Sequence, residues 1–151
     1  LIVADPRVTK TAMMADIFDE GALLESFYMS PEMIGEMQGR KMLIGSHSVT
    51  HPVFSKLDPA DQKIEIEASF RFLDEITGGL TLRTFCYPYG LSHTYTEQTQ
   101  RLLGEAGCRF SVSVDFRDIE AADIRDRVQA LPRHDCNAFP FGKPTSGAEE
   151  A

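Results

Sequence analysis

Two histidines, His47 and His51, stand four residues apart in a segment that is otherwise rich in serine, threonine and proline. A helical turn or a compact loop would bring both imidazoles to one side of the chain, where they could bind a divalent metal ion. Open zinc sites combine such closely spaced histidines with a carboxylate and a water molecule. The alternative is that both histidines only cap the structure that follows. Their position directly after an apolar run favours the metal site.

A second cluster of chemically capable residues covers residues 83–90, with the sequence RTFCYPYG. Alternation along a strand would place Arg83 and Tyr87 on the same face, while Pro88 and Gly90 would turn the chain. An arginine at the start of a buried parallel strand needs a carboxylate partner, and such partners cluster at active sites. The alternative is a core strand that ends in an aromatic turn.

The elements that must position these clusters alternate between helices and strands. Apolar periodicity predicts helices over residues 11–26, from 31 onward, and over 58–77, 94–107 and 118–128. Short apolar or alternating runs predict strands over residues 42–45, 82–87, 109–114 and 130–136. This order predicts an α/β fold with a parallel sheet or barrel, whose functional loops leave the carboxyl ends of the strands.

Capping residues mark the ends of several expected helices. Ser30, which a proline follows, and Asp58 are suited to N-cap positions. Gly78 supplies a stop, and Thr94 with Glu97 forms a capping-box pattern.

Composition restricts the class of protein. The 151 residues are enough for one domain, and 42% hydrophobic with 25% charged residues predicts a packed core. The net charge of −8 argues against general nucleic-acid binding. No apolar run approaches the roughly 20 residues that span a bilayer, and no signal peptide is visible. We expect one domain over residues 1–142 and a flexible tail over residues 143–151.

The three cysteines, Cys86, Cys108 and Cys136, are widely spaced and form no CxxC pair. This pattern is typical of reduced thiols and not of a disulfide framework, and it leans toward the cytoplasm.

Together and in this order, the two clusters resemble motifs of the polysaccharide deacetylases, carbohydrate esterase family 4 with its NodB-homology domain. The segment from His47 to Pro52 is similar to the H-[ST]-x-x-H-P motif, and the segment from Arg83 to Gly90 resembles R-x-F-x-[YR]-P-[YF]-G. The interval between them, mostly one helix, fits the family's β-α-β spacing. The resemblance spans residues 31–107 and continues weakly to residue 137.

The resemblance implies a distorted (β/α) barrel and a metal-dependent hydrolase. Such an enzyme removes N-acetyl, or sometimes O-acetyl, groups from a sugar or polysaccharide. By analogy, His47 and His51 would bind a divalent metal, usually zinc, beside a carboxylate, and metal-bound water would attack the acetyl carbonyl. A catalytically inactive metal- or glycan-binding module with the same fold is the second hypothesis. A structural domain without metal is the third, and it predicts histidine side chains that point apart.

Further roles follow from the same resemblance. Arg83 matches the arginine that orients the catalytic aspartate, and the backbone N–H of Tyr89 matches the oxyanion-binding position. His134 occupies the place of a late-strand histidine that protonates the leaving amine, and its alternative is a surface residue at a strand end. Neighbouring Arg133 would pair with Asp135 or face the substrate. Residues expected to bind the substrate are Tyr87, Pro88 and Asp115.

The family's first motif, T-F-D-D-G, supplies the catalytic base and the third metal ligand, and this chain contains only an imitation of it. Asp19 and Glu20 form that imitation, but they lie too close to His47 for the elements expected in between. We therefore expect the motif upstream of Leu1 and a domain truncated at its N-terminus. In a second departure, Asp118 stands in a D-x-x-D pattern without the family's tryptophan and is expected to cap a helix.

Overall fold

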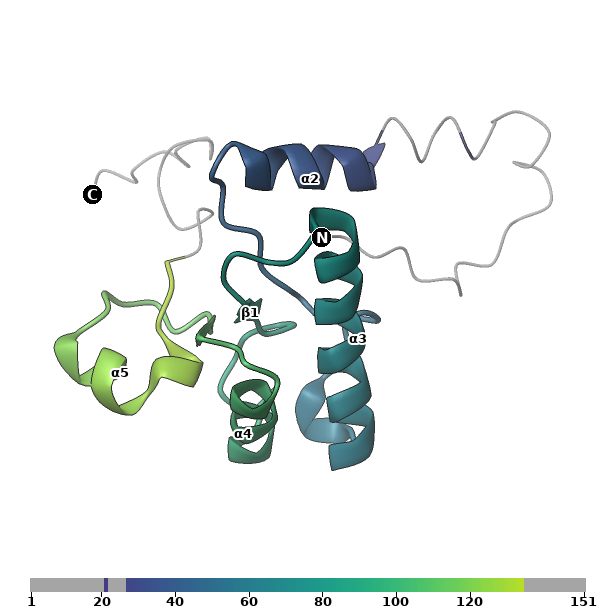
Figure 1. Cartoon of the computed structure of the whole chain (residues 1–151). Helices are drawn as coiled ribbons and strands as arrows, with labels where there is room; N and C mark the ends of the chain where they lie inside the picture. Colours follow the sequence, from purple (N-terminus) through teal and green to yellow (C-terminus); the bar gives the residue numbers. More distant parts are fainter. Residues whose placement is uncertain (1–20, 22–26, 135–151) are drawn as a thin grey trace, which may run out of the picture.

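The computed structural model describes residue 21 and residues 27–134 (Figure 1). The elements in chain order are α2 (Pro31–Gly39), the 3-10 helix η1 (Phe54–Lys56), α3 (Pro59–Thr77), β1 (Thr84–Cys86), α4 (Glu97–Glu105), β2 (Phe110–Val112), α5 (Ala121–Asp126) and the 3-10 helix η2 (Val128–Ala130). The predictions for Asp19, Glu20, Cys136 and the tail over residues 143–151 lie outside the described residues, as does almost all of the helix expected over residues 11–26.

Parallel chain segments form the centre of the fold. β1 pairs in parallel with β2, with Phe85 opposite Ser111. Ser46 bridges to Phe85 on the outer side of β1, and Leu131 bridges to Val112 on the outer side of β2. Four segments thus lie in chain order, with α3, α4 and α5 in the connections between them. The parallel α/β arrangement is confirmed, whereas the described part of the chain forms a two-stranded sheet with flanking bridges and not a closed barrel.

The prediction of a strand over residues 42–45 is wrong. None of these four residues pairs with β1, and the bridge to it is made by Ser46, the next residue along the chain. Met42 and Leu43 are 51% and 55% exposed. A continuous apolar run is a poor guide here because it shows hydrophobicity without showing which neighbour covers it.

Capping residues explain where α2 begins and where α3 begins and ends. Asp58 Oδ1 accepts hydrogen bonds from the backbone N–H groups of Ala60 and Asp61, both at 2.9 Å, at the start of α3. Gly78, with a φ of 73°, ends this helix in the left-handed conformation. Ser30 caps α2 through Met33 N at 3.3 Å. These N-caps and this stop agree with the sequence predictions.

The start of α4 is a correction. Thr96 and Thr99 form its capping box, two residues later than predicted. Thr94 is instead engaged in the preceding loop, where its hydroxyl donates to Leu91 O at 2.7 Å. The helix expected over residues 118–128 is also shorter, because α5 begins at Ala121 with Glu120 as its N-cap.

The core lies where α3 and α4 meet the strands. α3 also packs against both α2 and α4. Phe85 of β1 is 1% exposed and contacts Phe54 and Phe70 edge-to-face. Beside it, the rings of Tyr87 and Tyr95 stack at a centroid distance of 3.8 Å. Within the described residues, no helix combines the length and apolarity needed to cross a membrane.

Candidate metal-binding and hydrolase site

The histidine loop, residues 46–52, is anchored to the edge of β1. Ser46 donates its N–H to Thr84 O and accepts from Cys86 N, both at 2.9 Å. His47 follows, and its Nδ1 lies 2.6 Å from the carbonyl oxygen of Cys86. Because a carbonyl only accepts, Nδ1 must carry the proton, which leaves the lone pair of Nε2 for a ligand. This arrangement matches the backbone-oriented histidines of metal sites.

The loop then turns so that the second histidine comes back beside the first. Ser48 and His51 both adopt positive φ values, 68° and 57°. Ser48 Oγ accepts a hydrogen bond from His51 N at 3.1 Å. The ring centroids of His47 and His51 lie 4.8 Å apart at an interplanar angle of 70°. The expectation that the loop brings both imidazoles together is therefore confirmed, and their metal role stays a prediction.

The surroundings favour neutral imidazole at the first histidine. Burial lowers the pKa of His47, the neighbouring His51 lowers it further, and the hydrogen bond to Cys86 O opposes both effects. Neutral imidazoles suit zinc and similar transition metals. In the described part of the chain, no group of three or more His, Cys, Asp or Glu side chains is arranged to hold a metal ion. The two imidazoles are therefore suitable ligands for such a metal, but they make up only part of a complete site.

The segment after β1 brings Tyr89 against the histidine loop. Its ring lies 4.8 Å from that of His51, its side chain is 55% exposed, and its φ is 61°. Gly90 O accepts from Val114 N at 2.9 Å, which joins this turn to the end of β2. Pro88, by contrast, is fully buried. Of the three aromatic-turn residues expected at the site, only Tyr89 presents its side chain to solvent.

Tyr87 belongs to the core and not to an open surface. It is 1% exposed, and its hydroxyl donates to Gln129 O at 2.6 Å while it accepts from Ser111 Oγ at 3.1 Å. Burial raises the pKa of this phenol strongly. The expected contact of the Tyr87 side chain with substrate is corrected accordingly: alternation along β1 turns this residue inward, like Phe85.

Arg83 has the carboxylate partner that its sequence position predicted, but at the far end of β1. It donates to Asp74 Oδ2 and to Ala106 O, both at 2.6 Å, and its guanidinium lies 5.4 Å from the ring centroid of Phe70. Since Arg83 precedes β1 and His47 contacts Cys86 at the other end, the structure does not bring Arg83 to the histidines. Its role in orienting a catalytic aspartate has no support in this geometry.

Another arginine does reach this end of the strands. Arg133 donates its backbone N–H to Asp115 O at 3.0 Å and Nη1 to Cys86 Sγ at 3.2 Å. Its Nε is buried without a hydrogen-bond acceptor among the described residues. A buried N–H of this kind normally has an acceptor, and an anion suits a guanidinium best. The sequence feature that could have indicated a role for Arg133 at the site was its position at the end of the last expected strand.

His134 forms a pair with a carboxylate. Its Nε2 lies 2.8 Å from Asp118 Oδ1, and its ring packs edge-to-face on Phe116 at 4.8 Å. Asp118 therefore does not cap α5 as predicted, because Glu120 has that position. Asp115 is bound by Arg117 at 3.3 Å.

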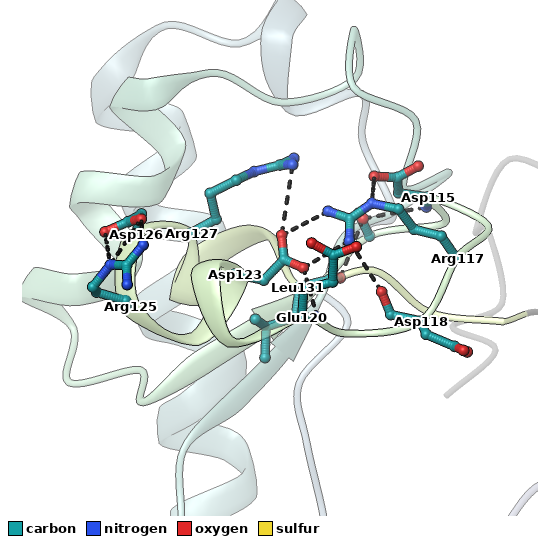
Figure 2. A network of polar contacts seen from close by, with 10 residues as sticks. Asp115, Arg117, Asp118, Glu120, Asp123, Arg125, Asp126, Arg127 and Leu131 are labelled. Atoms are coloured by element: carbon teal, nitrogen blue, oxygen red, sulfur yellow. Dashed lines mark hydrogen bonds and ion pairs between the residues drawn. The ribbon is translucent and has the colours of Figure 1, made fainter.

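Figure 2 shows the network of ion pairs that holds together the loop between β2 and α5. Arg117 makes a bidentate contact with Asp123, at 2.6 and 2.7 Å, and Arg127 approaches the same carboxylate at 3.7 Å. Asp123 is 3% exposed and also accepts from Glu120 N at 2.9 Å. The Arg117 guanidinium keeps the pKa of Asp123 well below its usual value. These contacts fix the loop that carries Asp115 and Asp118.

The described residues thus form a parallel α/β arrangement with a loop of paired histidines at one end of the strands. The sequence profile of the polysaccharide deacetylase family matches residues 7–111, and the chain belongs to this family. Polysaccharide deacetylases are generally metal-dependent. The resemblance found in the two motifs is thereby confirmed.

A similar solved structure is the deacetylase PplD of Streptococcus pyogenes in complex with acetate. The two chains are 21% identical, with a TM-score of 0.64, over 75% of this chain and 47% of PplD. This likeness shows a shared fold, and the present chain spans about half the length of that relative. No curated protein sequence matches this chain.

Proposed function

We propose that this chain carries the metal-binding histidines of a deacetylase that hydrolyses N-acetyl or O-acetyl groups on a sugar or polysaccharide. The observation that carries the proposal is the pairing of His47 with His51, with Nδ1 of the first tied to the backbone of β1. Family membership supports deacetylation as the reaction.

His47 and His51 would hold the divalent ion, for which two imidazoles and a carboxylate make zinc the best choice. When bound, such an ion supplies Lewis-acid activation of water and of the acetyl carbonyl. The third ligand would be a carboxylate outside the described residues, and the orphaned Nε of Arg133 is suited to hold a carboxylate beside the histidines. Arg133 would thus take the role that the family resemblance implied for Arg83.

Three further residues would each have a separate role in amide hydrolysis. The backbone N–H of Tyr89 would donate to the developing oxyanion, and its exposed ring would pack on the sugar. His134, oriented by Asp118, would donate a proton to the departing amine. Asp115, whose backbone carbonyl accepts from Arg133 N, would contact the substrate.

The first test is calorimetric titration of one equivalent of zinc into the chelator-stripped protein. His47→Ala and His51→Ala should each abolish stoichiometric binding, because a single imidazole cannot hold the ion tightly. His93→Ala is the matched control, since this exposed histidine lies outside the histidine loop. Stoichiometric zinc in either loop variant would exclude the site.

The second test measures acetate released from N-acetylated glucosamine oligomers by the zinc-loaded protein. Release that disappears in His47→Ala supports the deacetylase. Zinc binding without any release would favour instead a metal- or glycan-binding module that kept the fold.

A further inference from the structure

Glu65 on α3 makes three hydrogen bonds to the histidine loop. Its Oε2 accepts from the backbone N–H groups of Val49 at 2.8 Å and Thr50 at 3.0 Å. Its Oε1 accepts from the Thr50 hydroxyl at 2.7 Å. We propose that Glu65 is a positioning residue that holds the histidine loop in the conformation that binds metal. This inference rests on the proposed function of the two histidines.

The loop needs such support because its backbone is unusual. Ser48 and His51 lie on either side of the residues that Glu65 binds. Both have positive φ values, which residues other than glycine rarely adopt. Such conformations persist only where surrounding contacts enforce them, and they cluster at functional sites. The positive φ of His51 is part of the turn that returns its ring to His47. Loss of the Glu65 contacts would release the middle of this turn.

The helix that carries Glu65 is a rigid support. One turn further along α3, Ser69 Oγ lies 2.7 Å from Ser46 Oγ, so the same face of the helix contacts the start of the loop. Ile66 and Phe70, each directly after one of these contacting residues, are 0% and 1% exposed and anchor α3 in the core. A site supported from a packed helix is held more precisely than one supported from a loop.

Glu65 acts through the loop and is not assigned as a ligand. Both of its carboxylate oxygens are occupied by donors from Val49 and Thr50. Removal of partners that orient metal ligands commonly weakens metal affinity by about 10- to 100-fold. We therefore expect Glu65→Ala to weaken zinc binding by a factor in that range, measured by competition with a chromophoric chelator. Glu65→Gln should recover part of the loss, since its carbonyl oxygen can still accept from the loop.

Glu67→Ala is the matched control on the same helix. Glu67 is partly exposed and pairs with Lys63 at 3.2 Å, and its removal should change zinc affinity less than about twofold. The visible spectrum of bound cobalt provides a second readout. It should change in Glu65→Ala and remain the same in Glu67→Ala, because it reports ligand geometry and not stability.

Failure of this inference can be distinguished from failure of the proposed function. Absence of zinc binding in the unaltered protein would overturn a metal site that is completed within this chain. In that case the imidazole NMR signals of the metal-free protein still test the positioning, since Glu65→Ala should shift those of both loop histidines. Equal zinc affinity, equal cobalt spectra and unchanged imidazole signals in Glu65→Ala would overturn the positioning role.

Discussion

Gly45 is the residue at which one methyl group should disturb both the fold and the site. A Cβ built on Gly45 would lie 2.5 Å from Thr84 Oγ1 and 3.3 Å from Thr84 O. Thr84 is 7% exposed in β1, so its side chain cannot swing into solvent. Gly45 also directly precedes Ser46, whose backbone bonds to Thr84 O and Cys86 N place His47. Gly45→Ala must therefore push the histidine loop away from β1 or distort the strand.

The expected magnitude follows from the size of the clash. Oxygen and carbon atoms at 2.5 Å must separate by several tenths of an ångström or more, and overpacking of this kind costs about 1–3 kcal/mol. For a chain of this length, each kcal/mol lowers the Tm by about 2–4 °C. We expect Gly45→Ala to unfold at a correspondingly lower urea concentration. Its zinc affinity should also fall, because His47 loses its alignment with Cys86 O.

Urea titration followed by circular dichroism measures the first effect and calorimetry the second. Thr84→Ala removes the clashing hydroxyl, so the double variant should lose less stability than the sum of the two single variants. Gly104→Ala in α4 is the control, because a Cβ there meets no atom within 4 Å, and it should be neutral or up to about 1 kcal/mol more stable. Unchanged stability in Gly45→Ala, or a strictly additive double variant, would refute the packing argument.

Three further results are expected. Asp58→Ala should cost about 1 kcal/mol in urea unfolding, since two backbone N–H groups of α3 lose their cap, and an unchanged midpoint would contradict the capping role. Burial raises the pKa of the Cys108 thiol to about 12, so iodoacetamide at pH 8 should modify it only after unfolding, and mass spectrometry would expose any labelling of the native protein. The lowered pKa of Asp123 means that its ionised form contributes stability above the usual value of 3.8, which is lost as the pH falls through the folded-state pKa. Asp123→Asn should flatten this acid loss in a series of Tm measurements, and a curve parallel to that of the unaltered protein would argue against it.

The sequence by itself determined the features that depend on a few neighbouring residues. Ser30, Asp58 and Gly78 define helix ends because a cap is completed within one turn. The spacing of His47 and His51 was enough to bring their rings together, since four residues fit one compact loop. The order of the two motifs was enough to identify the family.

Only the tertiary structure decided which distant residues serve the site. Arg83 looked suited to the end of β1 beside the histidines, yet its contacts with Asp74 and Ala106 hold it at the other end. Arg133 and Glu65 reach the region of the histidines from segments far along the chain. Apart from the position of Arg133 at the end of an extended segment, no local pattern marks these residues. A buried guanidinium or a loop-binding carboxylate acquires its role from whatever the fold packs beside it. Hydrogen bonds within one turn depend on neighbouring residues, so they can be predicted from the sequence. The burial of a side chain and its pairing with a residue far along the chain arise only once the chain has folded.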